Sequence, residues 1–206
     1  MTTNPSILLK DGGFDMEARA REIAEVIHPL PLSVEVTTND TGEMLEQARS
    51  LAAWAPNVVI KIPVINERGE PCLGVVKRLE LEGIRVNMTA VMSFGQVALG
   101  AKAGATYVSI FAGRVSDEGH DSAKLIRQSV DWLREWGYKS KIIVGSIREV
   151  MNIQDAALAG AHVITIPPQF MDKLADHQFT RATVKGFVSD ARKALAKASD
   201  QRALVS

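Results

Sequence analysis

Several residue types are scarce in this sequence, and each shortage excludes a class of protein. The 206 residues contain a single cysteine, Cys72, which rules out an internal disulfide and suits a reducing cytoplasm. Lys+Arg and Asp+Glu both number 24, so the net charge is zero and no basic stripe indicates a nucleic-acid partner. No apolar run approaches the length of a membrane span and the N-terminus is polar, so we expect a cytoplasmic protein with neither signal peptide nor membrane segment.

What the sequence does contain is a regular alternation of short β-branched runs and longer amphipathic stretches. Strands are predicted at 33–37, 58–63, 85–89, 107–111, 141–146 and 163–166. Helices are predicted at 15–27, 42–53, 74–82, 94–103, 123–136, 150–159, 170–175 and 181–196. Strand and helix in this regular order predict a parallel sheet within a single domain, residues 1–206.

One lysine interrupts the apolar run 58–64. The run is rich in β-branched residues and predicts a buried strand, in which a lysine is rarely found without a partner or a function. Burial disfavours the charged ammonium, and the neutral amine of Lys61 could attack a carbonyl and form a Schiff base. The alternatives are a charge on an edge strand and a structural ion pair.

Polar residues recur at the C-terminal ends of the predicted strands. They are Glu35, Lys61, Asn87, Thr89 and Ser109, with Phe111 next in line. Side chains at the ends of successive parallel strands converge at the mouth of a (β/α)8 barrel, where its active sites lie. An open doubly wound sheet also fits the alternation, but no G-x-G-x-x-G follows a first strand. We therefore predict an α/β fold of the (β/α)8 TIM-barrel class.

Four motifs carry a resemblance to a known family. They are TTNPS at 2–6, VIKIP at 59–63, NMTA at 87–90 and YVSIFAGR at 107–114. Their order and spacing closely resemble the transaldolases, in particular the short-chain branch that includes the fructose-6-phosphate aldolases. The resemblance implies a barrel that cleaves a ketose phosphate through a lysine Schiff base. The dihydroxyacetone unit then passes to an aldehyde acceptor or is released.

The resemblance also implies a role for individual residues. Lys61 would form the Schiff base, and Glu35 and Thr89 would hold the water that shuttles protons. Asn4 and Asn87 would bind hydroxyl groups of the dihydroxyacetone unit. The remaining substrate contacts would come from Ser109, Phe111, Arg114, Ser146 and Arg148. The guanidinium groups of the two arginines, with Ser146, would hold the terminal phosphate.

Some of these residues also have plainer interpretations. Glu35 could form an interior ion pair, Asn4 could turn the chain before Pro5, and Arg114 could be a solvated loop charge. His120 is more simply a neighbour of a helix cap than a ligand. No His, Cys and Asp cluster has metal spacing, and a Schiff base is itself the electron sink, so we expect no metal and no cofactor.

The chain departs from the family pattern in two places. It begins at Thr-Thr-Asn-Pro, so the family's first strand, first helix and most of the second strand are missing, together with an acid/base aspartate. Asp11 does not replace that aspartate convincingly, and a start assigned too far downstream or a truncated protein would explain the difference. The second departure is the segment 65–71, which is longer than expected and follows the lysine strand at the barrel mouth.

Two residues favour transfer over simple lysis. The aldolases of this branch have glutamine and tyrosine where this chain has Glu35 and Phe111, and phenylalanine has no hydroxyl to order a water. The leading hypothesis is a transaldolase of carbohydrate metabolism, such as the pentose phosphate pathway, acting on fructose 6-phosphate or sedoheptulose 7-phosphate. The alternatives are an aldolase of the same mechanism and a non-catalytic sugar-phosphate-binding barrel.

The last predicted helix bears on assembly. Between residues 181 and 196 its apolar residues form one stripe, which could pack on the barrel itself or on a neighbour. Short-chain relatives form rings through this helix, so the resemblance implies a homo-oligomer, a pentamer or a decamer.

Overall fold

The computed structural model describes residues 1–4 and 15–203. Pro5, Ser6 and Asp11, to which the sequence drew attention, lie outside the described residues. The chain divides into two compact units, one covering Met1–Ile166 and the other beginning at Pro167. The first unit contains the sheet and every residue of the candidate site.

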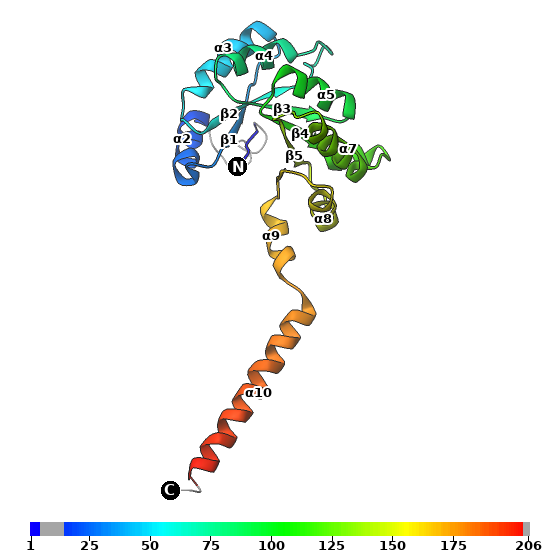
Figure 1. The fold of residues 1–206 in the computed structure, drawn as a ribbon. Helices are drawn as coiled ribbons and strands as arrows, with labels where there is room; N and C mark the ends of the chain where they lie inside the picture. Colours follow the sequence, from blue (N-terminus) through cyan, green and yellow to red (C-terminus); the bar gives the residue numbers. More distant parts are fainter. Residues whose placement is uncertain (5–14, 204–206) are drawn as a thin grey trace. The chain divides into compact units, whose positions relative to one another are not determined.

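Six parallel strands form one curved sheet in chain order, with helices along its outer side (Figure 1). The strands are β1 (Leu32–Glu35), β2 (Val58–Pro63), β3 (Val86–Val91), β4 (Tyr107–Phe111), β5 (Lys141–Gly145) and β6 (Val163–Ile164). Each strand pairs in parallel with the next along the chain. This arrangement is part of a (β/α)8 barrel and confirms the predicted fold class.

Each strand is followed by at least one helix. The helices of the first unit are α2 (Met16–Ile27), α3 (Thr41–Ala52), α4 (Leu73–Leu81), α5 (Phe94–Ala103), α6 (Ala112–Asp117), α7 (Ser122–Glu135) and α8 (Val150–Leu158). Only α6 was not predicted, because six residues are too few to show an apolar period. It begins directly after β4 and carries Arg114, so that arginine lies on a helix and not in a loop, although its side chain is exposed as a solvated charge would be.

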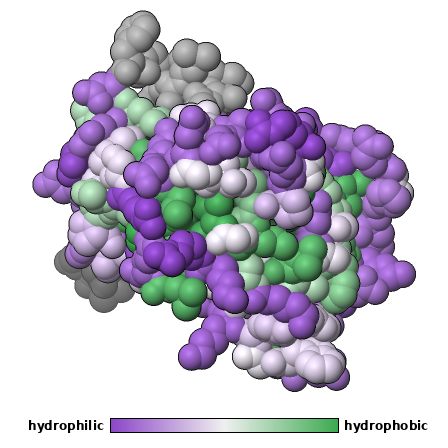
Figure 2. Space-filling model, turned by 90° about the horizontal axis from the view of Figure 1, so that it is seen from above, coloured by the Kyte–Doolittle hydropathy of each residue, from purple (hydrophilic) through white to green (hydrophobic). Residues whose placement is uncertain are grey.

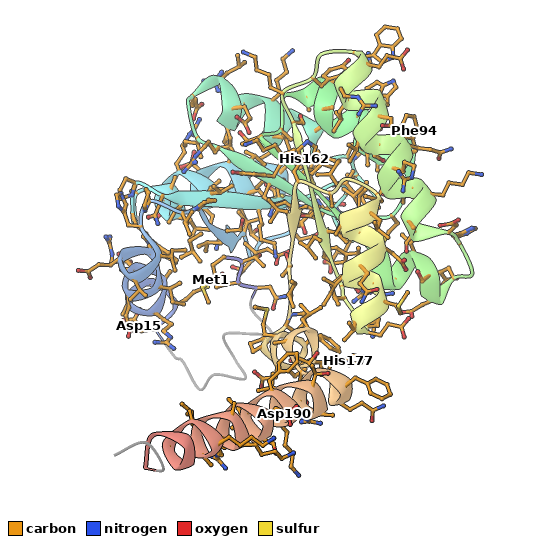
Figure 3. The ribbon with its side chains drawn as sticks, turned by 60° about the horizontal axis from the view of Figure 1, so that its bottom comes forward. Met1, Asp15, Phe94, His162, His177 and Asp190 are labelled. Atoms are coloured by element: carbon orange, nitrogen blue, oxygen red, sulfur yellow. The ribbon has the colours of Figure 1, made fainter. Side chains whose placement is uncertain are left out.

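The first residues of the chain lie beside the free edge of β1. Thr2 forms a parallel bridge with Ser33, and the backbone N–H of Thr3 donates to the Ser33 carbonyl at 2.9 Å. The Ser33 N–H in turn donates to the Met1 carbonyl at 2.9 Å, which keeps Met1 next to the sheet (Figure 3). A short stretch of backbone therefore covers ladder groups that an edge strand would leave exposed.

The core lies between the sheet and its helices. Ile60 and Ile62 of β2 are fully buried, as expected for a strand covered on both faces. Helix α5 approaches closely at Gly100, where an added Cβ would lie 2.3 Å from the Met88 side chain. Some large apolar side chains remain exposed on the helices, and Figure 2 shows hydrophobic residues across the middle of one face with hydrophilic ones around them.

The second unit is helical. It contains α9 (Pro168–Ala175) and the 26-residue α10 (Gln178–Ala203), which extends beyond both ends of the predicted 181–196. The apolar stripe of α10 is exposed, with Phe187 at 70% and Leu195 at 69%. None of the described helices is long and apolar enough to cross a membrane.

Candidate active site

The sheet register brings the predicted polar residues into one row. Glu35 of β1 lies opposite Lys61 of β2, and Lys61 lies opposite Asn87 of β3. Neighbouring residues in a parallel register point to the same face of the sheet, and alternate residues of one strand share that face. The row therefore points into the concave side, near the C-terminal ends of the strands.

Lys61 is the centre of this row. The residue is 5% exposed, and its Nζ donates to Glu35 Oε2 at 2.8 Å and to the Thr3 carbonyl at 3.0 Å. Because β2 lies between β1 and β3, the edge-strand interpretation is wrong. The ion pair that sequence reasoning offered as the other alternative is present. Such a pair does not exclude catalysis, since it places a proton acceptor within hydrogen-bond reach of the amine.

A hydrogen-bond chain fixes the side chain of Asn87. Ser109 Oγ donates to Asn87 Oδ1 at 2.7 Å, and Asn87 Nδ2 donates to Ser33 Oγ at 3.2 Å. All three residues are buried and come from three different strands. Sequence reasoning missed Ser33, although it lies two residues before Glu35 and so shares its face.

Thr89 takes no part in the hydrogen bonds between Ser109, Asn87 and Ser33. The residue is fully buried, and its hydroxyl has no hydrogen-bond partner among the described residues. The strand is irregular here, with a register shift between Met88 and Val91 and a positive φ of 59° at Ala90. A buried polar group without a partner costs about 1–3 kcal/mol, and such exceptions concentrate at functional sites. The hydroxyl is therefore a candidate for contact with a small polar ligand.

A second group of predicted residues surrounds a cavity of about 630 Å³. Its lining residues are Met92, Arg114, Val115, Asp117, Glu118, His120 and Arg148. Within the described part of the chain, the guanidinium group of Arg114 makes no ion pair or hydrogen bond. Arg148 follows β5, and its Nη2 donates to Asp117 Oδ2 at 2.8 Å. Both arginines that the family resemblance assigns to one phosphate therefore line the same cavity.

Three further predicted residues have less direct positions. Ser146 follows β5 with a positive φ of 60° and is not one of the cavity's lining residues. Phe111 ends β4 opposite Gly145, where an added Cβ would lie 3.7 Å from its ring. Asn4 is partly buried and directly follows Thr3, whose carbonyl contacts Lys61. The substrate contacts expected of these residues stay predictions.

Sequence reasoning missed the other polar residues of the cavity. His120 was interpreted as a neighbour of a helix cap, and Asp121 does cap α7 by accepting from the Lys124 N–H at 2.8 Å. His120 nevertheless also lines the cavity. Asp117 lies three residues after Arg114 on α6, but a helix of six residues shows no apolar period and the contact of Asp117 with Arg148 joins distant parts of the chain. Among the residues described, no group of His, Cys, Asp and Glu could hold a metal ion.

The long segment after β2 folds into an ordered hairpin. Ile65 and Pro71 form an antiparallel bridge, and the buried Asn66 side chain accepts from the backbone N–H of Arg68 and Glu70 at 3.0 and 2.9 Å. Cys72 follows directly, and burial raises the pKa of its thiol. Because the hairpin follows the C-terminal end of β2, it lies at the same end of the sheet as the polar row.

Comparison with known proteins places this geometry in a family. The family transaldolase/fructose-6-phosphate aldolase matches residues 1–205. The chain belongs to this family. The transaldolase assignment extends to individual relatives: a probable transaldolase of Dehalococcoides mccartyi is 38% identical over 190 residues, covering 92% of this chain and 86% of that protein.

Two further relatives agree. A probable transaldolase 2 of Listeria monocytogenes is 42% identical over 190 residues, covering 92% of this chain and 84% of that protein. A probable transaldolase 1 of Bacillus cereus is 42% identical over 193 residues, covering 94% of this chain and 87% of that protein. The chain is an enzyme of the transaldolase type.

Proposed function

We propose that this enzyme is a Schiff-base transaldolase. It transfers a dihydroxyacetone unit from a ketose phosphate, such as fructose 6-phosphate or sedoheptulose 7-phosphate, to an aldehyde acceptor. The observation that carries the proposal is the buried Lys61, held by Glu35 at 2.8 Å in the interior of the sheet. A lysine in this position can pass its proton to the carboxylate and attack a carbonyl as the neutral amine.

The reaction then uses the polar row in sequence. Lys61 Nζ bonds to the substrate's carbonyl carbon, and the oxygen leaves as water with protons delivered through Glu35. The Thr89 hydroxyl would hold that water, and the support is that it is buried without a hydrogen-bond partner among the described residues. The imine accepts the electron pair when the adjacent carbon–carbon bond breaks, and the proton of the neighbouring hydroxyl leaves for a base. After the first aldehyde leaves, the enamine attacks the acceptor aldehyde, whose oxygen takes up a proton. Water then hydrolyses the new imine, which releases the product ketose and the free amine of Lys61.

Asn87 and the cavity hold the substrate at its two ends. The amide of Asn87 is held by Ser109 and Ser33, so this side chain can bind substrate hydroxyl groups without first becoming ordered. Arg114 and Arg148 present guanidinium groups to the far end, where the phosphate lies. Guanidinium forks match phosphate oxygens in both geometry and charge.

Borohydride reduction tests the covalent step. The native protein is incubated with fructose 6-phosphate and sodium borohydride, and its intact mass should rise by the reduced dihydroxyacetone or hexose adduct. Lys61→Met should abolish the adduct and lower turnover by at least about 10⁴-fold, as for loss of a nucleophile. The exposed Lys77→Met is the matched control and should trap like the native protein. An adduct on Lys61→Met would refute the assignment.

Addition of an acceptor separates transfer from lysis. With fructose 6-phosphate as donor and erythrose 4-phosphate as acceptor, a transaldolase should form sedoheptulose 7-phosphate faster than free dihydroxyacetone. Glu35 and Phe111 support this outcome, because Phe111 offers no hydroxyl to direct water onto the enamine. An aldolase would instead release free dihydroxyacetone faster than it forms the new ketose. The non-catalytic binding barrel has no support from the relatives.

We further propose a cytoplasmic homo-oligomer, a pentamer or decamer. The support is α10, whose exposed Val184, Phe187 and Val188 form part of one apolar stripe. Light scattering should give several times the 22.4 kDa chain mass. Deletion of 181–206 should lower the ratio of particle mass to chain mass, and an unchanged ratio after deletion would remove α10 from the interface.

A further inference from the structure

The two arginines of the cavity are held differently. Arg114 has no charged partner among the described residues, whereas Arg148 Nη2 donates to Asp117 Oδ2 at 2.8 Å. Asp117 ends α6 and Arg148 follows β5, so this ion pair joins two elements that are 31 residues apart in the chain. The pair is not needed to neutralise buried charges, because the Asp117 and Arg148 side chains are 54% and 57% exposed.

Further contacts fix the path of Arg148. An added Cβ on Gly113 would lie 2.8 Å from Arg148 Cγ and 2.9 Å from its Nε, so the side chain passes directly over the glycine. The backbone N–H of Arg148 donates to Asn152 Oδ1 at 3.0 Å. Arg148 is thus constrained by two helices, through Gly113 and Asp117 of α6 and through Asn152 of α8.

The ion pair leaves most of the guanidinium free. The group carries five N–H donors, and the carboxylate of Asp117 occupies one of them at Nη2. The remaining donors can still form the two parallel bonds that a phosphate prefers. Asp117 therefore restrains the arginine without using up its binding capacity.

Asp117 could also act against phosphate, because the two groups repel each other. That repulsion is screened, since both members of the pair are more than half exposed to solvent. The conformational entropy lost when a long side chain is ordered is not screened. On this balance the ordering effect is larger than the repulsion.

We propose that Asp117 is a positioning residue that holds Arg148 ready for the phosphate of the substrate. This role rests on the proposed function, in which the cavity receives that phosphate. Asp117 itself touches neither the substrate nor the reacting atoms. Its effect should appear in affinity for phosphate and not in the rate of the covalent steps at Lys61.

Two substitutions separate ordering from charge. Asp117→Ala removes both the hydrogen bond and the charge, whereas Asp117→Asn keeps an oxygen that can accept from Nη2. Titration calorimetry with inorganic phosphate should show affinity lowered about three- to tenfold by Asp117→Ala. Asp117→Asn should stay within about twofold of the native protein, because an amide acceptor can still hold the guanidinium. Tighter binding by Asp117→Ala, or no change in either variant, would overturn the positioning role alone.

Kinetics give an independent readout. In Asp117→Ala the KM for fructose 6-phosphate should rise by the same three- to tenfold, with kcat and the use of unphosphorylated fructose unchanged. Adding Asp117→Ala to Arg148→Ala should have no further effect, because the two residues act through one contact. A fall in kcat or an additive double variant would overturn the role.

A matched control and the native protein complete the test. Asp131→Ala breaks a similar exposed pair with Arg134 on α7, outside the cavity lining, and should change neither phosphate affinity nor KM. If the native protein binds no phosphate, or Arg148→Ala binds it normally, the phosphate site of the proposed function is wrong and the positioning role falls with it.

Discussion

The interior row around Lys61 and the cavity around Arg148 are built on opposite principles. In the row, Lys61, Asn87 and Ser109 are buried and their polar groups are satisfied by neighbouring strands. In the cavity, the arginines are exposed and one guanidinium has no partner in the described structure. Low dielectric strengthens interactions in the row, whereas solvent screens those in the cavity. The difference agrees with the proposed function, in which the row performs the chemistry and the cavity binds the charged end of the substrate.

Loss of Glu35 should give the largest effect of the predictions that test this division. Glu35→Ala removes the carboxylate that holds the Lys61 amine, so kcat should fall by about 10²–10⁴-fold, the range for a general acid–base residue. KM for fructose 6-phosphate should change little, because the arginine cavity is untouched. A rise in KM with normal kcat in steady-state assays would break the division.

Loss of Arg114 should give the converse pattern. Arg114→Ala should raise KM for phosphorylated sugars more than tenfold, since a charge-assisted contact contributes about 1.5–3 kcal/mol. The measurement is the ratio of kcat/KM for fructose 6-phosphate to that for fructose. The exposed Arg127, which bonds the Leu158 carbonyl away from the cavity, supplies the control Arg127→Ala. An unchanged ratio in Arg114→Ala would remove it from phosphate binding.

Thr89 should separate activity from stability within the row. Thr89→Val replaces a buried hydroxyl that has no partner in the described part of the chain by a methyl group of similar shape. Chemical denaturation should show a free energy of unfolding raised by about 1 kcal/mol, because the cost of the unpaired group disappears. Turnover should fall at least about tenfold through loss of a proton-relay contact. Unchanged turnover would make the hydroxyl a structural irregularity without a catalytic role.

The smallest predicted effect lies far from both regions. His162 precedes β6 (Figure 3), and its Nδ1 accepts from the Ile142 N–H at 3.0 Å. Burial, and secondarily Lys141, hold the pKa of His162 below its usual 6.5. The unfolded chain therefore binds the proton first, so the stability contribution is complete above pH 6.5 and declines as the pH falls below it.

Urea unfolding between pH 7.5 and 5 measures this decline. His162→Gln should remove only a small part of the acid sensitivity, because His162 is exposed and a glutamine oxygen can still accept the Ile142 bond. His28→Gln, at an exposed position, is the control. Identical pH profiles for the native protein and His162→Gln would contradict the prediction.

The fold was largely predictable because its elements have strong local signals. Strand β2 has the predicted bounds, since a run covered on both faces is continuously apolar. Helix α6 was not predictable from a period, and α10 continues past residue 196 because most of the residues that follow are good helix formers outside the apolar stripe. Sequence patterns detect the apolar face of a helix or strand, but they do not show at which residue an element with polar ends begins or ends.

The site was predictable where a polar residue interrupts an apolar strand. Lys61 and Asn87 are of this kind, and the register places them side by side as expected. Ser33 and Asp117 were missed because serine and aspartate are common and their significance comes from tertiary contacts. The approach of Asp117 to Arg148 depends on how α6 packs beside the end of β5, which no local pattern encodes.

The buried cysteine has a practical consequence for following motion in this enzyme. Cys72 is 1% exposed, and its N–H donates to the Val64 carbonyl at 3.1 Å, which closes the base of the hairpin after β2. Because the thiol has a raised pKa and no access to solvent, a reagent can modify it only when this base opens. The rate of alkylation of the native protein thus serves as a clock for opening of the hairpin, with no label added. A ligand that binds against the hairpin should lower the rate of Cys72 alkylation.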